Sequence, residues 1–544
     1  MTFYFETPWL DEFVLVSIVF ILVRIYWYTT ARHDHWKKQG IAYIKPLPFF
    51  GNLKDVVFLK SSRGEVMKYF YRELDGEPFG GAFFFNNPIL VVRDPELVKT
   101  ILIKNFSHFQ NRFPSSDHSQ PLSQNLVSLN GPKWKSLRTK LTPTFTSGKL
   151  KNMIDAMAEC SLEMNTELQA AANNNSIIEV KDMAGNFTTQ VIGSVIFGLQ
   201  FNSIKNPDSE FRKIGREFVD PSYKRAVTMM MNTIAPRISK LLGLNSLPKN
   251  VESFFYGLVK DTIRYREKNE VTRNDFFQLL IQLKNKDTLV EDRSKEDAHL
   301  RHQIDVVDNK AEQFEMTESL MTDQCFVFFL AGFETSSTTM SFVLYELAVN
   351  PDIQERLGAE IDEVLEKHKG KITYDAIHEM SYLDKVVNAV ELNTTSALAN
   401  YATEAETMRK HPPAPNLTRI CTEPFTLQGT NLKLQKGDMV IIPSIGFHHD
   451  PKYFPNPDQF DPERFSEENK MTRPSFTYLP FGEGPRMCIG MRFGLMQAKV
   501  GLVGLLSRYK FSVCEKTAIP LVYESLSLIL TAKNGFYLTI SNRK

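Results

Sequence analysis

The pattern of apolar and polar residues opens with one long hydrophobic stretch near the N-terminus. Residues 13–31 are apolar apart from Ser17, Arg24 and a threonine pair, and these 19 residues are about enough to cross a bilayer as a helix. Acidic residues precede the stretch and basic residues follow it, which predicts a cytosolic catalytic part. A cleaved signal peptide would begin with basic residues. We therefore expect an uncleaved membrane anchor over 1–31, a basic, proline-rich linker over 32–52 and a catalytic domain over 53–544.

Beyond the anchor, helix-period apolar runs dominate, and strand-like alternation is confined to short stretches. The pattern predicts a mainly α fold with minor β. The predicted elements are a hairpin over 81–92, a helix that begins at Asp94-Pro95, a loop over 106–121, mostly helix over 141–283 with breaks near 173–175, 202–208 and 244–248, a charged connection over 285–318, long apolar helices over 320–347 and 491–506, and a hairpin over 528–540 around Lys533-Asn534-Gly535.

Composition excludes several classes of protein. Lys and Arg number 64 against 63 Asp and Glu in 544 residues, so the net charge of +1 does not favour nucleic acid as a partner. The five cysteines are odd in number, scattered along the chain and without a C-x-x-C pair. This distribution argues against a disulfide scaffold or a zinc site and for a reducing compartment. No Pro/Ser/Gly-rich linker divides the folded part, so we expect one catalytic domain.

One cysteine stands in a distinctive setting, the loop Phe481-Gly-Glu-Gly484-Pro-Arg486-Met-Cys488-Ile-Gly490, directly before an apolar helix. A thiol at a helix N-terminus is expected to have a lowered pKa, because backbone N–H groups and the helix dipole favour the thiolate. Such a thiolate can act as a nucleophile, a redox thiol or a metal ligand. Arg486 offers a fork for a carboxylate, the two glycines allow backbone to approach something flat, and Phe481 supplies an aromatic lid. The simpler alternative is a buried cysteine in a turn.

This loop, F-x-x-G-x-R-x-C-x-G, resembles the haem-binding loop of the cytochrome P-450 superfamily. The resemblance extends from about residue 47 to the end of the chain and implies the mainly helical fold of that superfamily. It also implies haem (iron protoporphyrin IX) as cofactor, with Cys488 as the axial ligand of the iron. Details of the motifs look most like the insect microsomal branch that oxidises plant toxins and insecticides.

A second motif of the resemblance is Trp134-x-x-x-Arg138 on a predicted basic helix. Residues four apart share one helix face, so the indole N–H and the guanidinium can reach the same carboxylate. In the superfamily such a pair binds a haem propionate, and Arg112 and Arg419 match further propionate-binding arginines. The alternative is an ordinary Trp/Arg pair on the surface.

The long apolar helix is interrupted by polar residues at Ala331-Gly332-Phe-Glu334-Thr335, which resembles the oxygen-activating motif of the superfamily. Small residues at 331 and 332 would leave room for dioxygen, and hydroxyls bonded to the preceding turn would open the helix locally. The resemblance implies that Glu334 and Thr335 deliver protons. The alternative is a Ser/Thr-rich packing patch.

Glu406-x-x-Arg409 and Pro462-Glu-Arg464-Phe resemble the E-x-x-R and P-E-R-F elements of the superfamily. The resemblance implies a buried Glu406-Arg409-Arg464 brace for the haem loop, whereas E-x-x-R alone is equally typical of a surface ion pair.

The chain departs from the superfamily at residues 389–405, which separate two segments that are adjacent in close relatives. As continuous helix, these residues would rotate Glu406 by about 100° from the face that the preceding residues bury. We therefore expect a surface excursion or a splicing irregularity, or else impaired catalysis.

The function predicted is a haem-thiolate monooxygenase of the endoplasmic reticulum membrane that oxidises lipophilic small molecules. The chain has no flavin or nicotinamide fingerprint, so electrons should come from NADPH through a separate reductase, with cytochrome b5 as a further candidate donor. The helix at Trp134, with Arg486 and Lys499, is a candidate docking face. The alternatives are an endogenous steroid or fatty-acid hydroxylase, and a haem protein that binds ligands without turnover. A peroxide-using isomerase is disfavoured by the Glu334-Thr335 pair.

Two further predictions concern surfaces. Residues 227–231 and 234–244 form an apolar patch that is either core or a membrane-dipping entrance to the active site. Apolar pocket-lining residues are expected in 106–121, around 202–244, at Phe326 and Phe329, in 415–417 and in 526–530.

Overall fold

The computed structural model describes residues 8–113, 120–245, 247–273, 275–286, 315–387, 406–427, 430 and 432–543. Within them the fold is mainly α with minor β, as predicted. The helices are α1 (Pro8–Thr30), α2 (His35–Lys38), α3 (Lys54–Val57), α4 (Arg63–Glu73), α5 (Pro95–Lys99), α6 (Gly131–Leu141), α7 (Ser147–Lys151), α8 (Ile154–Asn173), α9 (Val180–Ile192), α10 (Glu210–Val219), α11 (Tyr223–Ile234), α12 (Pro236–Leu241), α13 (Lys249–Lys268), α14 (Phe276–Lys286), α16 (Glu318–Val349), α17 (Pro351–Lys367), α18 (Tyr374–Glu379), α19 (Ser381–Val387), α20 (Glu406–Lys410), α21 (Ser444–His448), α22 (Glu467–Thr472) and α23 (Met491–Leu506).

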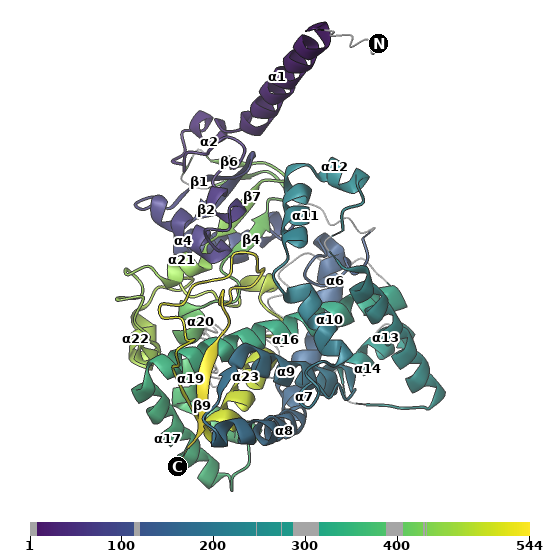
Figure 1. Cartoon of the computed structure of the whole chain (residues 1–544), viewed down its shortest axis with the longest axis vertical. Coiled ribbons are helices and arrows are strands. Elements are labelled where there is room, and N and C mark those ends of the chain that lie inside the picture. The colour runs from purple at the N-terminus through teal and green to yellow at the C-terminus, as the bar shows by residue number, and fades with distance from the viewer. Residues whose placement is uncertain are drawn as a thin grey trace, which may run out of the picture.

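Helix α1 extends away from the rest of the molecule, at the end that carries α2 and the first strands (Figure 1). Its segment Glu12–Thr30 is long and apolar enough to cross a membrane and is not buried by protein. The end of α1 is held by Asn86, whose Nδ2 donates to the Tyr28 carbonyl (2.7 Å) and whose Oδ1 accepts from the Arg32 amide (3.1 Å). The C-terminal end of α1 is therefore attached to the body of the protein.

Asn86 lies in the turn between the first two strands of a four-stranded sheet, whose order is β1-β2-β7-β4. Its strands are β1 (Phe79–Phe84), β2 (Asn87–Val92), β4 (Leu417–Ile420) and β7 (Met439–Ile442). The predicted hairpin is confirmed, with Phe84 opposite Asn87 next to the turn. The helix start is confirmed too, because the Asp94 side chain accepts a hydrogen bond from the Leu97 amide (2.9 Å) before Pro95 in α5.

The hairpin predicted over 528–540 is wrong. A turn does form at Lys533-Asn534, but the strand after it, β9 (Tyr537–Asn542), pairs with β8 (Tyr509–Ser512) and β3 (Ile177–Glu179). The segment before the turn instead forms a bridge between Ala532 and Tyr523. Alternation of apolar residues identified the strand but not its partners, which are distant in sequence. The remaining strands are β5 (Phe425–Thr426) and β6 (Lys433–Leu434).

The core is organised around α16, a helix of 32 residues that is buried along most of its length. It packs against α9, where the Thr188 hydroxyl donates to the Phe333 carbonyl (3.0 Å), and against α23 and α13. The predicted side-chain bonds to the preceding turn are present, from Thr335 to Ala331 (2.7 Å) and from Thr339 to Thr335 (2.9 Å). The predicted local opening of the helix is not found, because α16 continues as α-helix through this region.

The predicted insertion at 389–405 lies outside the described residues, but both of its flanks are described. The Thr407 hydroxyl in α20 donates to the Val386 carbonyl in α19 (3.0 Å). If the 17 residues 389–405 are not counted, Thr407 stands four positions after Val386. Its hydrogen bond then has the same spacing as the bond from the Thr335 hydroxyl to the Ala331 carbonyl within α16. The two short helices therefore meet as consecutive turns of one helix.

The apolar patch predicted over 227–244 is not core. Val227 and Ile238 are exposed, and Leu241 is 86% exposed. Helices α11 and α12, which carry these residues, lie at the same end of the molecule as α1 (Figure 1), and the Tyr28 hydroxyl of α1 donates to the Ile234 carbonyl (3.4 Å).

Candidate active site

The cysteine loop enters α23 through Gly490, which caps that helix. The Cys488 amide donates to the carbonyl of Phe481 (3.0 Å), which closes the loop, and the half-buried Phe481 ring packs beside Met408 and Met487. Gly484 has φ +73°, and a Cβ atom there would lie 2.2 Å from the Leu102 carbonyl oxygen. Its freedom therefore serves contact with the chain itself, not the predicted approach to a flat ligand. A Cβ atom on Gly490 would meet nothing within 4 Å, which leaves the predicted room on that side.

The thiol of Cys488 has free surface, although it lies deep among protein atoms, so it faces an internal hollow. Burial raises its pKa, and the Gly490 amide and the charges of Arg138 and Arg112 offset this only in part. The lowered pKa expected from the helix N-terminus is therefore wrong for the protein alone, since the loss of water outweighs the nearby donors. A metal cation bound at the sulfur would deprotonate it outright.

Four arginines form a cluster at the cysteine loop: Arg112, Arg138 and Arg419 lie near Arg486, and Arg112 and Arg138 also lie near the thiol. Among the described residues, no carboxylate forms an ion pair with any of them. The Nε atoms of Arg138 and Arg419 are buried without a hydrogen-bond partner, and Arg419 is only 2% exposed. Burial lowers the pKa of Arg419 to about 9 and that of Arg138 to about 10. Because guanidinium groups stay charged in proteins, the cluster needs an anion. A haem with two propionates and a ligand position for the thiolate fits this set of donors.

Arg486 is used differently from the other three. Its guanidinium donates to the carbonyls of Gln110 (2.8 Å), Leu129 (2.7 Å) and, more weakly, Leu126 (3.5 Å). It also stacks on Trp134, with 3.9 Å between Cζ and the ring centroid. The fork predicted to bind a carboxylate is therefore largely occupied by the chain. Arg112 adds to this order by donating to the Arg486 carbonyl (2.6 Å).

Trp134 and Arg138 occupy successive turns of α6 and are both buried, so the alternative of a surface pair is wrong. The Trp134 ring also packs on Phe106, with 5.8 Å between centroids. Since Arg138 lies close enough to influence the pKa of Cys488, the second motif reaches the same site as the cysteine loop.

The polar motif of α16 lies against the start of α23. A Cβ atom on Gly494 in α23 would lie 3.5 Å from the Ser336 hydroxyl, so the helix that follows the cysteine loop crosses α16 next to its polar motif. Ala331 is exposed although most of α16 is buried, which agrees with the predicted room beside the motif. Gly332 does not provide such room, because a Cβ atom there would lie 2.4 Å from the Ile192 side chain of α9. It is the glycine that lets the two helices approach.

Glu334 is buried and forms an ion pair with Lys181 of α9, with 2.7 Å between Nζ and Oε1. Lys181 also donates to the Thr338 hydroxyl, one turn further along α16. This lysine was missed by sequence reasoning, because no local spacing connects residues 153 positions apart. The carboxylate predicted to deliver protons is thus held on the side of α16 that faces α9, away from bulk water.

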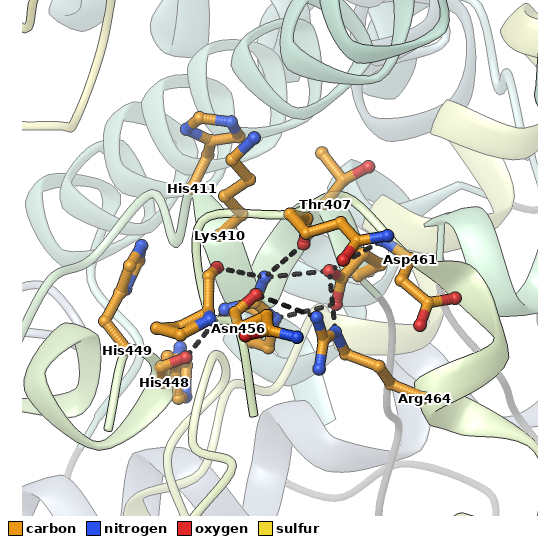
Figure 2. Close-up of polar contacts among 12 residues, drawn as sticks. Thr407, Lys410, His411, His448, His449, Asn456, Asp461 and Arg464 are labelled. Atoms are coloured by element: carbon orange, nitrogen blue, oxygen red, sulfur yellow. Dashed lines mark hydrogen bonds and ion pairs between the residues drawn. The ribbon is translucent and has the colours of Figure 1, made fainter. Parts of the chain in front are cut away.

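The brace predicted from E-x-x-R and P-E-R-F is present (Figure 2). Both oxygens of Glu406 accept from Arg409, at 2.7 Å to Nε and 2.7 Å to Nη2, and both residues are 0% exposed. Arg464 approaches the same carboxylate (3.4 Å), and the Asp461 amide donates to it (3.0 Å). Arg409 continues to the carbonyls of His448 (2.8 Å) and Pro457 (2.7 Å), so the surface ion pair is excluded.

The predicted docking face is largely wrong. Lys499 is buried and pairs with Asp384 of α19, and burial raises the pKa of Asp384 to about 6 in spite of that lysine. Arg486 and Trp134 are buried as well. On the basic helix at Trp134, which is α6, Lys133 is exposed.

Comparison with known proteins agrees with this geometry. Residues 42–540 match the cytochrome P450 family. Cytochrome P450 6k1 of Blattella germanica is 40% identical over 526 residues, which cover 96% of each chain. Cytochrome P450 6a2 of Drosophila melanogaster is 39% identical over 541 residues, 97% of this chain and 99% of the relative. Cytochrome P450 9e2 of Blattella germanica is 37% identical over 556 residues, 99% of each. The chain therefore belongs to the cytochrome P450 family and is a monooxygenase.

Proposed function

We propose that this chain is a membrane-anchored haem-thiolate monooxygenase that inserts one oxygen atom of O₂ into lipophilic foreign compounds such as plant toxins or insecticides. The observation that carries the proposal is the free thiol of Cys488 near a cluster of four arginines, three of them buried, that no described carboxylate neutralises. A metal macrocycle with two carboxylates would satisfy both features at once.

In this proposal Cys488 ligates the haem iron, while Arg112, Arg138 and Arg419 face the propionates, with Trp134 beside them. Arg138 and Arg419 have the free Nε donors that such carboxylates need. Arg486 orders the surrounding backbone through the carbonyls of Gln110 and Leu129. The Glu406-Arg409-Arg464 brace would support the cysteine loop through Met408, which lies between Glu406 and Arg409 and shares an apolar cluster with Met487. When bound, the haem supplies dioxygen binding and activation, with electron density donated by the thiolate.

Proton supply falls to Glu334 and Thr335. The Thr335 hydroxyl donates to Ala331, so its proton must leave that carbonyl before it can be delivered. Lys181 holds the Glu334 carboxylate in place and, because it is itself half-buried, connects the interior to the solvent side. If Glu334 takes up a proton from water on the solvent side, its rotation from Lys181 towards the small residue Ala331 would carry that proton inwards.

We further propose that the protein sits on the endoplasmic reticulum membrane with its catalytic domain in the cytosol. The apolar, unburied span of α1 and the exposed Ile238 and Leu241 at the same end of the molecule support a membrane-facing side. Electrons would come from NADPH through a reductase, and cytochrome b5 is a second donor to test. The exposed Lys133 offers such an acidic partner one contact.

The test is the Soret band of the reduced, carbon-monoxide-bound protein, followed by NADPH consumption and product formation with added reductase and a panel of lipophilic compounds. A strongly red-shifted band that disappears in Cys488→Ser supports thiolate ligation. A Cys488→Ser variant that keeps the same band would overturn the proposal. A good band without any product would favour a protein that binds ligands without turnover, and steroid or fatty-acid products would favour an endogenous hydroxylase.

A further inference from the structure

A segment that neither motif explains connects the two halves of the site. Residues 120–130, here called the strap, run from the loop before α6 along α16. The amide of Gln124 donates to Oδ2 of Asp323 (2.7 Å). The neighbouring Gln324 binds the strap twice, accepting from the Leu126 amide (2.9 Å) and donating to the Gln124 carbonyl (3.0 Å). Two adjacent side chains of α16 thus hold three backbone groups of the strap.

The other side of the strap is held by the cysteine loop. The carbonyls of Leu126 and Leu129 accept from Arg486 at 3.5 Å and 2.7 Å. The peptide groups of Leu126 therefore point in two directions, with the amide on Gln324 of α16 and the carbonyl on Arg486, two residues before Cys488. The strap spans the interval between the oxygen-motif helix and the cysteine loop.

Hydrogen bonds within the strap hold its residues in one fixed arrangement. The Asn125 side chain donates to the Leu122 carbonyl (2.8 Å) and accepts from the amides of Val127 and Ser128 (3.1 Å each). Leu122, Leu126 and Leu129 are buried, so the strap turns its apolar side inwards. A shift at the contact with α16 is consequently transmitted to the carbonyls that Arg486 binds.

Burying the Asp323 carboxylate to make this contact costs free energy. It is 3% exposed, and its second oxygen, Oδ1, is buried without a hydrogen-bond partner. Burial raises the pKa of Asp323 to about 6, and the Gln124 amide lowers it only in part. Among the described residues, no charged group on α16, the strap or the elements packed on them contributes to this pKa. A buried carboxylate without an ionic partner destabilises the fold, so packing alone does not account for it.

We propose that Asp323 and Gln324 are positioning residues that fix the strap, and through it the wall of the substrate cavity between α16 and the cysteine loop. Asp323 lies eight residues before Ala331, about 12 Å along the helix, so the strap covers the approach to the oxygen motif. The proposal rests on the proposed haem-thiolate function for its effect on ligands, but the attachment of the strap is a property of the protein alone.

The attachment is tested by hydrogen exchange of the peptide covering 120–130 in the haem-loaded full chain. Asp323→Ala removes the acceptor of the Gln124 amide and should speed exchange by about tenfold. Asp323→Asn keeps an acceptor oxygen without the buried charge and should not speed exchange. Glu318→Gln removes the same charge from an exposed position of α16 and serves as the control. Unchanged exchange in Asp323→Ala, or equal acceleration in Asp323→Asn, would overturn the proposal.

A pH series separates positioning from simple loss of stability. We call the strap closed when Gln124 is bound to Asp323 and open when that contact is broken. The pKa of Asp323 is higher in the closed state, where the carboxyl is buried, so lower pH favours the closed state. From pH 7.5 to 5.5, protection of residues 120–130 should rise about fourfold after correction for intrinsic exchange, given the pKa of about 6. This rise should be absent in Asp323→Asn. A rise of the same size in Asp323→Asn would assign the effect to another group and refute the role of Asp323.

The effect on the cavity is read with 1-phenylimidazole, whose ring needs the substrate side, and with imidazole as the small control. If the strap is closed only a tenth of the time in Asp323→Ala, the dissociation constant for 1-phenylimidazole rises about tenfold, while that for imidazole changes less than twofold. Equal changes for both ligands would contradict a positioning role. Absence of the red-shifted carbon monoxide band in the wild type would instead refute the proposed function, leaving the exchange result to decide on the strap.

Discussion

Replacing Glu406 by glutamine removes the charge at the centre of the brace while keeping the size of the side chain. In the wild type, both oxygens of Glu406 accept from Arg409, and the carboxylate also receives the Asp461 amide and the approach of Arg464. The glutamine NH₂ group would face N–H donors of the arginine where an oxygen stood. Arg409 would then remain fully buried without its counter-charge.

The expected cost follows from that burial. Breaking a buried ion pair by removing one partner typically destabilises a protein by about 3–5 kcal/mol, because the other charge is left uncompensated. Two additional contacts to the same carboxylate, from the Asp461 amide and from Arg464, place this case towards the upper end of that range. We expect the double variant Glu406→Gln/Arg409→Met to regain part of the loss, since it no longer buries an isolated charge, but to leave the His448 and Pro457 carbonyls without their donor.

The measurement is the free energy of unfolding in urea, followed both by far-UV circular dichroism and by the Soret band. The control is Glu363→Gln, which removes a partner of Lys367 from an ion pair on the exposed side of α17 and should not shift the urea midpoint. If Glu406→Gln unfolds within about 0.5 kcal/mol of the wild type, as an ordinary surface substitution would, the brace does not stabilise the fold as argued.

Three further predictions concern the rest of the site. Deleting residues 389–405 should join α19 to α20, keep the carbon monoxide band and raise the unfolding free energy by about 2 kcal/mol through the shorter loop, and a chain that no longer folds would contradict the rejoined helix. Gly484→Ala should cost about 1–3 kcal/mol and lower haem retention, whereas Gly257→Ala in α13, where a Cβ atom would meet nothing within 4 Å, should be tolerated; equal haem loss in both would refute the contact with Leu102. Lys181→Met should lower the product-forming rate by about tenfold and raise the NADPH used per product, while Lys205→Met, at an exposed ion pair, should not; unchanged coupling would separate Lys181 from proton supply.

The parts of the site that depend on local spacing could be predicted from the sequence. Trp134 and Arg138 share a face of α6 because they are four residues apart, and Glu406 reaches Arg409 because they are three apart. Burial could not be predicted from spacing. For that reason we expected a lowered pKa for Cys488, whereas burial raises it. Burial also explains why Lys499 and Arg486, both basic in the sequence, proved unsuited to docking.

Pairings between distant segments were beyond the sequence pattern. Lys181 meets Glu334, and Gln124 meets Asp323, only because α9 and the strap are folded against α16. For the same reason the strand at 537–542 was recognised but assigned the wrong neighbour. Tertiary packing selects these partners, and a one-dimensional pattern of apolar residues holds little information about it.

The grip of Asn86 on the end of α1 bears on how this enzyme is produced for study. A truncation that removes the chain through Thr30 also removes the Tyr28 carbonyl. Asn86, in the turn between β1 and β2, then loses this hydrogen-bond acceptor. A cut made before Tyr26 would keep the contact with Asn86 and remove most of the apolar helix α1. Expression trials that compare the two start points would show whether soluble yield depends on removal of the hydrophobic span or on loss of the contact between Asn86 and Tyr28.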